Sequence, residues 1–401
     1  MAEKFDIVIV GGGMVGSVLA HALVLEGWQV AIVEATPPAE NPSFDERVTA
    51  LSEGSWRYLD GLGLVTAALK GRAQPIREVR VSQRGHLGLT RIEADEMGVA
   101  ALGRVVCNQS LRLALEAAPS CQAVRRIEPA RFVSLVQTDE QVTATISTET
   151  GTRSLEARLL VAADGVRSSV REAAGIAVRS RDYGQDALIV RLRPERSHRG
   201  IAFEHFTDSG PLAVLPMVDG LCSGVVTLWR EDSEDWCALD DEAFAERLNR
   251  RFGQRLGRLR ALPGRAVYPL VLSQAESLVS GRVTVLGNAA HGLHPVAGQG
   301  FNLCLRDVRH LVDALRPARD AVDPARRHGD PGAPEPLARW AADRLRDHRR
   351  TVGLTDGLVG GFSNRSALVD RLAGPLRGAG LTFLDKCPPL KRTLARLTMG
   401  V

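Results

Sequence analysis

The stretch FDIVIVGGGMVGSVLAHALVLEGWQVAIVEA, residues 5–35, has the pattern of a strand, a glycine-rich turn, a helix and a second strand. Residues 7–10 and 30–33 are short, continuous apolar runs, which are typical of parallel strands buried on both faces. Between them, Leu19 and Leu23 recur at helical spacing. The stretch therefore predicts a β-α-β unit and places the chain among the α/β proteins.

The turn carries the glycine fingerprint of a dinucleotide site, Gly11-x-Gly13-x-x-Gly16. Gly11 permits the tight turn, Gly13 lets backbone amides approach a pyrophosphate, and Gly16 lets the helix pack on the strand. Glu34 ends the second strand, where an acid can accept a hydrogen bond from a ribose hydroxyl. Met14 opens the helix and belongs to the same expected cofactor-binding set. The unit predicts an adenine dinucleotide, either NAD or FAD, in preference to a glycine-rich turn without a ligand.

Two later segments repeat the order of strand, turn and helix. In LLVAADGVRSSVR, residues 159–171, an apolar run leads into Asp164-Gly165 and a helix start. In VTVLGNAAHGLHPVAGQGFNLCLRDV, residues 283–308, a strand ends in glycine, and a second glycine cluster precedes a helix with apolar residues near 3.6 spacing. A strand followed by Asp-Gly is commonplace alone, but three such segments in one chain predict a shared site.

Length and composition limit the classes of function. A chain of 401 residues has room for about two or three packed units. Its 44% apolar and 24% charged content is that of a globular protein, and a net charge of +4 is too small to predict nucleic-acid binding. The six cysteines are scattered, which indicates a reducing, cytoplasmic compartment without disulfides or zinc. The apolar run at the start is too short for a signal peptide, and no run reaches transmembrane length.

Together the three segments resemble the flavoprotein aromatic hydroxylases, the fold group of para-hydroxybenzoate hydroxylase. That family has an early GxGxxG, a mid-chain Asp-Gly that serves flavin and nicotinamide binding, and a late Gly-Asp before a flavin-facing helix. The likeness extends over most of the chain and is strongest to the hydroxylases of ubiquinone biosynthesis, above all the 2-octaprenyl-6-methoxyphenol hydroxylase subgroup. The stretches that carry this closer likeness are FDERVTALS (44–52), VRVSQRGHLG (79–88), ALGRVV (101–106), AFEHFTDSGPLAVLPM (202–217) and GNAAHGLHPVAGQGFNLCLRDV (287–308).

The resemblance implies an α/β fold with two interleaved domains. A Rossmann-like FAD-binding domain is expected together with a largely antiparallel substrate-binding domain, and a helical segment is expected at the C-terminus. The expected ranges are 1–71, 101–179 and 276–345 for the FAD-binding domain, 72–100 and 180–275 for the substrate-binding domain, and 346–401 for the helical segment.

Alternating apolar residues predict strands of the substrate-binding domain at 76–81, 202–206, 212–217 and 223–229. Residues 316–336 are rich in proline, glycine and charge, and predict a mobile connection after the flavin-facing helix. Helical character resumes beyond that connection.

The same resemblance implies an FAD-dependent monooxygenase that hydroxylates the ring of a polyprenylated phenol in ubiquinone biosynthesis. NAD(P)H would reduce the flavin, and O2 would then give an electrophilic flavin C4a-hydroperoxide. No second GxGxxG is present, which indicates transient docking of NAD(P)H. Two alternatives stay open: the same chemistry on another ubiquinone precursor or a soluble aromatic, and a flavin-binding assembly subunit without turnover. Beyond the substrate and O2, the implied partners are a membrane surface and other ubiquinone-biosynthesis enzymes, and the oligomeric state stays open.

The resemblance also assigns roles at the start of the late helix. Gly298, Gln299 and Gly300 are expected to present bare backbone amides to the electron-rich edge of the isoalloxazine ring, where the helix dipole adds partial positive charge. A side chain at the first or third of these positions would hold the ring away. Phe301 and Asn302, the next residues, belong to the same expected set of cofactor contacts. The alternative is a plain loop before a core helix.

Other site residues come from the family motifs. Asn288 stands where the wider family has aspartate, and its amide can still hydrogen-bond a ribityl hydroxyl. Asn108 is expected to contact the FAD, and Arg47 is expected near the flavin or the substrate, with a surface arginine as the alternative. His294 and Pro295 are expected to shape the active face, and with Arg47 they form the expected catalytic set. The two histidines of this loop lack a carboxylate or cysteine at ligand spacing, so no metal is expected.

The C-terminal stretch LDKCPPLKRTLARLTMGV, residues 384–401, puts Leu390, Leu394 and Leu397 on one side of a helix with basic residues nearby. Such a helix can rest on a membrane surface. Because the segment is short, packing on its own domain or on a partner is the preferred interpretation. Peripheral membrane contact is expected from the implied substrate alone.

Overall fold

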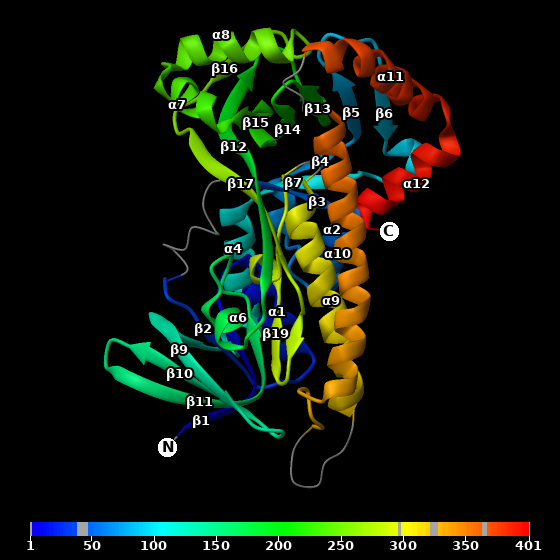
Figure 1. Cartoon of the computed structure of the whole chain (residues 1–401). Helices are drawn as coiled ribbons and strands as arrows, with labels where there is room; N and C mark the ends of the chain where they lie inside the picture. The colour runs from blue at the N-terminus through cyan, green and yellow to red at the C-terminus, as the bar shows by residue number, and fades with distance from the viewer. Residues whose placement is uncertain (1, 38–46, 296–297, 321–327, 363–366, 401) are drawn as a thin grey trace.

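A sheet with a parallel centre occupies the lower part of Figure 1, and we call it the parallel sheet. In the computed structural model, which describes residues 2–37, 47–295, 298–320, 328–362 and 367–400, its order is β18–β19–β11–β1–β2–β8. β1 pairs in parallel with β2 and β11, and β11 pairs in parallel with β19, so their carboxyl ends share one edge. The bounds are β1 (Glu3–Val10), β2 (Val30–Val33), β8 (Arg125–Ile127), β11 (Gly151–Ala162), β18 (Val279–Ser280) and β19 (Val283–Val285).

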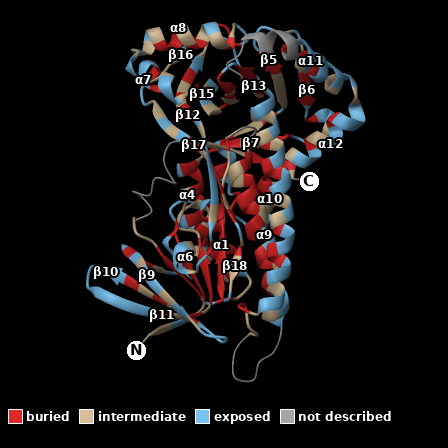
Figure 2. Cartoon of the chain, in the orientation of Figure 1, coloured by how far each residue is buried: buried red, intermediate tan, exposed pale blue. Residues whose placement is uncertain are grey.

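Helices and a hairpin complete this part of the molecule. α1 (Met14–Leu25) connects β1 to β2, and α9 (Gln299–Asp320) packs against α1. The buried residues follow these helices and the parallel strands (Figure 2). A hairpin of β9 (Ala130–Gln137) and β10 (Val142–Thr148) extends the sheet from β11. The shorter helices are α2 (Glu53–Gly61), α3 (Ala67–Gly71), α4 (Asn108–Ala117), α5 (Pro119–Gln122) and α6 (Ser169–Ala173).

A nine-stranded, mostly antiparallel sheet forms the upper part of Figure 1, in the order β20–β17–β12–β15–β14–β13–β5–β6 with β16 beside β12. On one face, residues such as Leu188 and Val226 pack against α7 (Arg230–Ala238) and α8 (Asp241–Phe252). The bounds are β5 (Glu78–Gln83), β6 (Leu89–Glu93), β12 (Val178–Pro194), β13 (Ile201–Thr207), β14 (Gly210–Pro216), β15 (Cys222–Trp229), β16 (Leu259–Ala261), β17 (Ala266–Ala275) and β20 (His291–Gly292).

A small sheet joins the two larger ones, in the order β3–β7–β4. Ala202 and Leu215, on the face of the nine-stranded sheet away from α7 and α8, share a core with Val48 and Val105 of this small sheet. The bounds are β3 (Val48–Ser52), β4 (Ala73–Ile76) and β7 (Gly103–Cys107), with the 3-10 turns η2 (Asp95–Met97), η3 (Val218–Gly220) and η4 (Gly287–Ala289).

Three further helices form the C-terminal part: α10 (Pro334–Phe362), α11 (Ala367–Lys386) and α12 (Pro388–Met399). α10 runs along α9, α11 packs on β6, and α12 contacts both α11 and α2 (Figure 1). Within the described ranges, every helix is too short or too polar to span a lipid bilayer.

The predicted α/β fold class is confirmed, and two local predictions need correction. The connection expected over 316–336 is too long, because α9 continues to Asp320 and α10 begins at Pro334; residues 321–327 lie outside the described ranges. Ion pairs from Glu26 to Arg316 and Arg319 hold this last turn of α9.

The strand expected at residues 76–81 is in fact two strands in different sheets. Ile76 ends β4 in the small sheet, and Glu78 begins β5 in the nine-stranded sheet, where β5 pairs in parallel with β13. The other expected strands correspond to β13, β14 and β15. The expected domain boundaries stay a prediction, and the boundary at 345/346 falls inside α10.

Candidate functional site

Four residues of the predicted site lie in a row along the carboxyl edge of the parallel sheet. Glu34, Gly11, Asp164 and Asn288 follow the last residues of β2, β1, β11 and β19, whose ends are in register. Asn288 is exposed although its neighbours on both sides are buried. In open α/β sheets, ligands bind in the crevice outside this edge.

The glycine turn has the close packing that its fingerprint requires. Gly11 has a φ of 107°, and a Cβ added there would lie 2.2 Å from the carbonyl oxygen of Ala163. A Cβ on Gly16 would lie 1.9 Å from the carbonyl oxygen of Gly11. α1 begins at the partly buried Met14, and its N-cap, Gly13, supplies no side-chain cap. The first-turn amides of α1 are therefore available to an anionic phosphate.

Glu34 already binds the glycine turn. Its Oε2 accepts a hydrogen bond from the amide of Gly12 at 2.5 Å, and its Oε1 accepts one from the amide of Thr36 at 2.9 Å. The carboxylate is half-buried beside the start of α1. A carboxylate fixed in this position can accept a hydrogen bond from a sugar hydroxyl.

Arg126 is a candidate that the sequence patterns did not single out. Its guanidinium lies 3.0 Å from the position that a Cβ on Gly12 would take, and it pairs with Glu128 at 2.9 Å. Beside the glycine turn, an arginine can offset the charge of a phosphate. No local signal marks it, because β8 reaches this place only through its pairing with β2.

Asp164 binds the first turn of α6 through one carboxylate oxygen. Its Oδ2 accepts a hydrogen bond from the amide of Val170 at 3.2 Å. Among the described residues, its buried Oδ1 has no hydrogen-bond partner. Gly165 follows with a φ of 88°, and a Cβ added there would meet no described atom within 4 Å. A buried acceptor beside open space is an arrangement that a bound hydroxyl would satisfy.

The start of α9 is anchored by Asn302 rather than by its glycines. The Oδ1 of Asn302 accepts from the amide of Ser52 at 2.8 Å, and its Nδ2 donates to the carbonyls of Ala50 at 2.9 Å and Gly298 at 2.7 Å. These bonds tie the helix start to β3. As a cofactor contact, Asn302 stays a prediction, because its side chain is already engaged by protein.

The other residues of this helix start differ in their surroundings. Gly298 has a φ of 60°, and its amide donates to the carbonyl of Pro295 at 3.1 Å; residues 296 and 297 lie outside the described ranges. Gln299 is buried, and its Nε2 donates to the carbonyl of Thr398 at 3.3 Å. A Cβ on Gly300 would meet no atom within 4 Å among the residues that the structure describes. Phe301 is partly buried against the main core.

Arg47 and Asn108 lie together at the junction of the sheets. The amide of Asn108 donates to the carbonyl of Arg47 at 2.9 Å, and its Oδ1 accepts from the hydroxyl of Thr49 at 2.7 Å. The guanidinium of Arg47 lies over the ring of Tyr268, 4.7 Å from its centroid. Arg47 therefore bridges the start of β3 and the nine-stranded sheet, and its expected role near the flavin or the substrate stays a prediction.

His294 is buried, and its ring meets Tyr183 edge-on at 5.3 Å. Burial lowers the pKa of His294 to about 4, although the charge of Asp356 opposes this shift. The hydroxyl of Tyr183 donates to Asp356, and Arg181 donates to the same carboxylate at 2.7 Å. Burial and the bond to Asp356 raise the pKa of Tyr183 to about 12. At neutral pH both rings are uncharged.

Tyr183, Asp356 and Tyr268 were missed by sequence reasoning. Tyr183 lies on β12 at an irregularity in its pairing with β17, and Asp356 lies on α10. They meet only because α10 returns along α9 to the nine-stranded sheet (Figure 1). No spacing rule within one segment could have paired them.

A buried polar cluster ties α9 to α10 behind the loop. Asp307, which is fully buried, accepts from His291 at 3.0 Å, from His348 at 2.9 Å and from Arg344 at 2.6 Å. The ligand atoms of the two histidines and the aspartate lie within 4.8 Å of one another, as in a metal site. The guanidinium of Arg344 on the same carboxylate opposes a second cation, so we interpret this cluster as a buried ion pair with added hydrogen bonds from two histidines.

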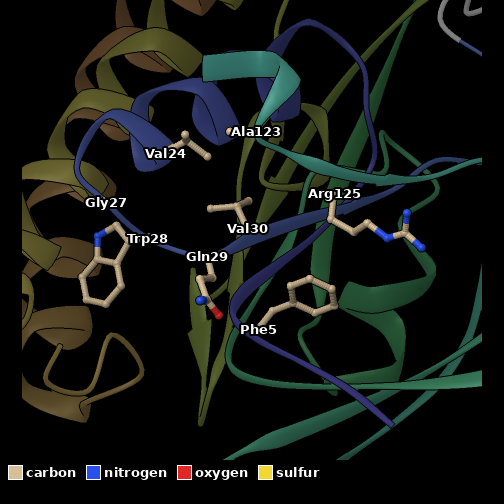
Figure 3. Close-up of a pocket in the computed structure, with 8 residues that line it drawn as sticks. All are labelled: Phe5, Val24, Gly27, Trp28, Gln29, Val30, Ala123 and Arg125. Carbon is tan, nitrogen blue, oxygen red and sulfur yellow. The ribbon is translucent and has the colours of Figure 1, made fainter. Parts of the chain in front are cut away.

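A hollow of about 430 Å³ lies at the opposite end of the parallel sheet (Figure 3). It opens near the amino ends of β1, β2 and β8, away from the row of predicted site residues. Its lining residues are Phe5, Val24, Gly27, Trp28, Gln29, Val30, Ala123 and Arg125. None of the predicted site residues lines it.

These features together fit an adenine dinucleotide: the tight glycine turn with its free helix amides, Glu34 beside them, and the carboxylate oxygen of Asp164 that lacks a partner among the described residues. The family model of the FAD binding domain matches residues 4–319, and the chain belongs to this family. It is an FAD-dependent hydroxylase.

Two relatives and one solved structure are similar to this chain over most of its length. A ubiquinone hydroxylase of Rhodospirillum rubrum is 40% identical over 98% of this chain and 89% of its own length. The 3-demethoxyubiquinol 3-hydroxylase of Escherichia coli is 31% identical over 100% of this chain and 99% of its own length. The crystal structure of p-nitrophenol 4-monooxygenase from Pseudomonas putida shares the fold, with a TM-score of 0.77 at 19% identity over 98% of this chain and 97% of that one.

Proposed function

We propose that this chain hydroxylates the aromatic ring of a polyprenylated phenol on the route to ubiquinone, with NAD(P)H as reductant and O2 as the oxygen source. The observation that carries the substrate class is the full-length similarity to two enzymes named for ubiquinone and a ubiquinol precursor. NAD(P)H is the reductant typical of the family. Bound FAD supplies the redox and oxygen-transfer chemistry.

In this proposal the carboxyl edge of the parallel sheet holds the FAD. The first-turn amides of α1, next to Gly11 and Gly13, bind the pyrophosphate, and Glu34 accepts from a ribose hydroxyl. Asp164 and Asn288 offer oxygen and amide groups to the ribityl chain. The row of strand ends, the orphaned oxygen of Asp164 and the exposure of Asn288 support this arrangement.

The protein contributes to the reaction by stabilising negative charge on the flavin and by excluding water. The amide of Gly300, at the start of α9, and the guanidinium of Arg47 stabilise negative charge on the reduced ring. Buried His294 and the neutral Tyr183 keep water from the reacting face. With a pKa of about 4, His294 is a weak base, so its role is to position the loop rather than to carry a proton.

We also infer that the chain works at a membrane surface beside other enzymes of the same route. A polyprenyl tail partitions into a bilayer, so the ring of such a phenol must be met there or delivered from there. A soluble aromatic substrate, or a flavin-binding role without turnover, is the alternative outcome of the tests that follow.

Two experiments test the proposed function. A strain that lacks this chain should accumulate one ubiquinone precursor that is missing a single ring hydroxyl or methoxy group, as measured by mass spectrometry of lipid extracts. Normal ubiquinone in that strain would contradict the substrate assignment. Purified protein should be yellow and should oxidise NAD(P)H faster when a short-tailed phenolic precursor is added; flavin binding without such stimulation in lipid or detergent would favour the assembly role.

A further inference from the structure

Five large apolar side chains are exposed on three neighbouring elements, the β5–β6 turn, α11 and α12. We call them the C-terminal apolar surface. Their exposed fractions are 96% for Leu87, 74% for Leu376, 63% for Phe383, 48% for Leu390 and 63% for Leu397. Exposed apolar side chains on neighbouring elements mark an interaction site more often than widely scattered single ones do.

The packing of α11 explains why part of this surface points outward. Gly378 lies against the backbone of the β5–β6 turn, where an added Cβ would come within 2.0 Å of the carbonyl oxygen of Leu87. One turn on, the carbonyl of Leu381 accepts from the hydroxyl of Thr90 at 2.7 Å. The inner face of α11 is thereby fixed on β6. Leu376 and Phe383, seven residues apart, share the exposed face of the helix.

α12 repeats this arrangement. Its buried residues Lys391, Ala395 and Met399 face the protein, and the latter two enter the core shared with the small sheet. Leu390 and Leu397, also seven residues apart, stay exposed. The expected packing of this helix on its own domain is thus confirmed for one face, and the other face stays without a cover in the described structure.

The charge of this edge favours an anionic partner. Residues 376–401 contain five lysines and arginines and a single acid, Asp385. Lys391 is paired with Glu96 at 2.7 Å. Lys386, Arg392 and Arg396 are exposed, and among the described residues none of these three takes part in an ion pair. The adjoining residues 84–96 add two arginines and three acids, so the edge keeps a net positive charge. A second copy docked on this edge would bring like net charges together, so self-association is disfavoured.

We propose that the C-terminal apolar surface docks on the surface of a bilayer that contains anionic lipids. Apolar side chains between exposed basic residues are the arrangement that inserts at the headgroup boundary and is attracted by acidic headgroups. The proposal rests on the proposed function for its purpose, because a polyprenylated phenol lies in that bilayer. It adds that the end of the nine-stranded sheet at β5, β6 and α11 faces the lipid, while the parallel sheet and its hairpin point away (Figure 1).

Vesicle binding of the purified holoprotein tests the proposal. Sedimentation with phosphatidylcholine vesicles that contain a quarter phosphatidylglycerol should capture the wild type, and vesicles of phosphatidylcholine alone should capture it at least tenfold less. The double variant Leu376→Glu/Phe383→Glu should bind the anionic vesicles at least tenfold more weakly. Val136→Glu, at an equally exposed site on β9 at the far end of the molecule, is the matched control and should bind like the wild type.

A second variant separates charge from apolar contact. Arg392→Gln/Arg396→Gln should lose the preference for anionic vesicles while it keeps its flavin and its thermal midpoint. Wild-type protein that stays in the supernatant, or a double variant that binds as well as the wild type, would overturn the proposal. The proposal would also be overturned if gel filtration showed that the wild type is an oligomer and that Leu376→Glu/Phe383→Glu disrupts it. The surface would then be an interface between copies of this protein.

The same variants keep this inference separate from the proposed function. Leu376→Glu/Phe383→Glu should oxidise NAD(P)H normally with a short-tailed, water-soluble phenol, because the surface lies outside the cofactor site. If the wild type binds vesicles but hydroxylates no phenolic precursor, only the proposed function fails. If it hydroxylates the soluble phenol but ignores vesicles, only the docking surface fails.

Discussion

Two glycines at the start of α9, only two residues apart, differ in what a side chain would cost. Gly298 has a φ of 60°, and an added Cβ would lie 3.3 Å from the Cβ of Ala50. Any larger residue there strains the protein with or without a cofactor. Gly300 lies in the first turn of the helix, where an added Cβ meets no atom of the described residues within 4 Å. Only Gly300 separates an effect on FAD from an effect on folding.

We therefore predict that Gly300→Leu keeps the fold and loses FAD. Replacing a helical glycine should leave the stability of the cofactor-free protein unchanged or raise it by about 0.5–1 kcal/mol. If the isoalloxazine ring occupies the space beside the helix start, the dissociation constant of FAD should rise at least tenfold, as measured by flavin fluorescence titration. Gly353→Leu, at a helical glycine of α10 with equally open surroundings, is the control. Full flavin content in Gly300→Leu would show that the ring lies elsewhere.

Thr227 allows an effect on substrate binding to be separated from an effect on folding. It is 1% exposed, and in the described structure its hydroxyl oxygen has no hydrogen-bond partner. On β12, Ala187 pairs with Thr227 on one side and with Tyr268 on the other. The side chains of all three lie on the face of the nine-stranded sheet away from α7 and α8. Burying a hydroxyl without a partner costs stability, so a bound phenol or ether oxygen is a reasonable partner for it.

Thr227→Val should thus act in opposite directions on folding and on binding. Removing an orphaned hydroxyl should leave the free energy of unfolding equal or higher by up to about 1 kcal/mol. Loss of a hydrogen bond to the substrate should raise the KM for the phenolic precursor about five- to tenfold, or about 1–1.4 kcal/mol. Thr227→Ser should retain the wild-type KM. An unchanged KM in Thr227→Val would remove this residue from the substrate site.

At the scale of elements, the strand ends were predictable and the helix pairing was not. Gly11, Glu34 and Asp164 each follow an apolar run within a few residues, so a local pattern locates them, and parallel pairing brings them to one edge. Asp356 meets Tyr183 only through the return of α10, which no local pattern encodes. The role of Asn302 as an anchor likewise depends on β3, far away in the sequence.

The contact between α9 and α10 depends on Asp307 and its partners. Burial opposes the charge of Asp307, but the facing histidines outweigh it and keep the pKa of the carboxyl well below its usual range. Arg344, also buried, binds it at 2.6 Å. Removing one member of a buried pair leaves the other charge uncompensated.

Asp307→Ala should therefore destabilise the protein by about 3–5 kcal/mol. The double variant Asp307→Leu/Arg344→Met should recover much of that loss, because an apolar pair can replace a buried ion pair of similar volume. Urea unfolding followed by tryptophan fluorescence, with Trp340 close to the cluster, measures both. If the single variant loses less than about 1 kcal/mol, the network does not hold the two helices together.

For the molecule as a whole, the α/β class was predictable because three separate segments each end a strand in a glycine turn. The division of residues 76–81 between two sheets was not, since β4 pairs with β7 and β5 pairs with the distant β13. The burial of whole side chains is equally invisible in a local pattern. Burial lowers the pKa of several histidines, and no local pattern predicts this shift.

The pH dependence of global stability follows from these histidines. Burial, reinforced by the charges of Arg255 and Arg84, lowers the pKa of His205 to about 4, and burial lowers that of His294 to a similar value. An unfolded histidine has a pKa of about 6.5, so between pH 6.5 and 4 the unfolded chain binds more protons than the folded one. Stability must then fall as the pH falls through this window. Carboxylates with lowered pKa values, such as Asp208, lose their contribution only below about pH 4.

His205→Gln should flatten this dependence, because glutamine stays neutral and can still hydrogen-bond the hydroxyl of Ser82, which lies 2.9 Å from the histidine Nδ1. Between pH 7 and 5, the free energy of unfolding of the wild type should fall by roughly 1–2 kcal/mol more than that of the variant. The other buried histidines are present in both proteins and cancel in the difference. Urea unfolding at pH 7, 6 and 5 measures this difference in the free energy of unfolding. If the free energy changes with pH equally in both proteins, His205 protonates in the folded state as easily as in the unfolded chain.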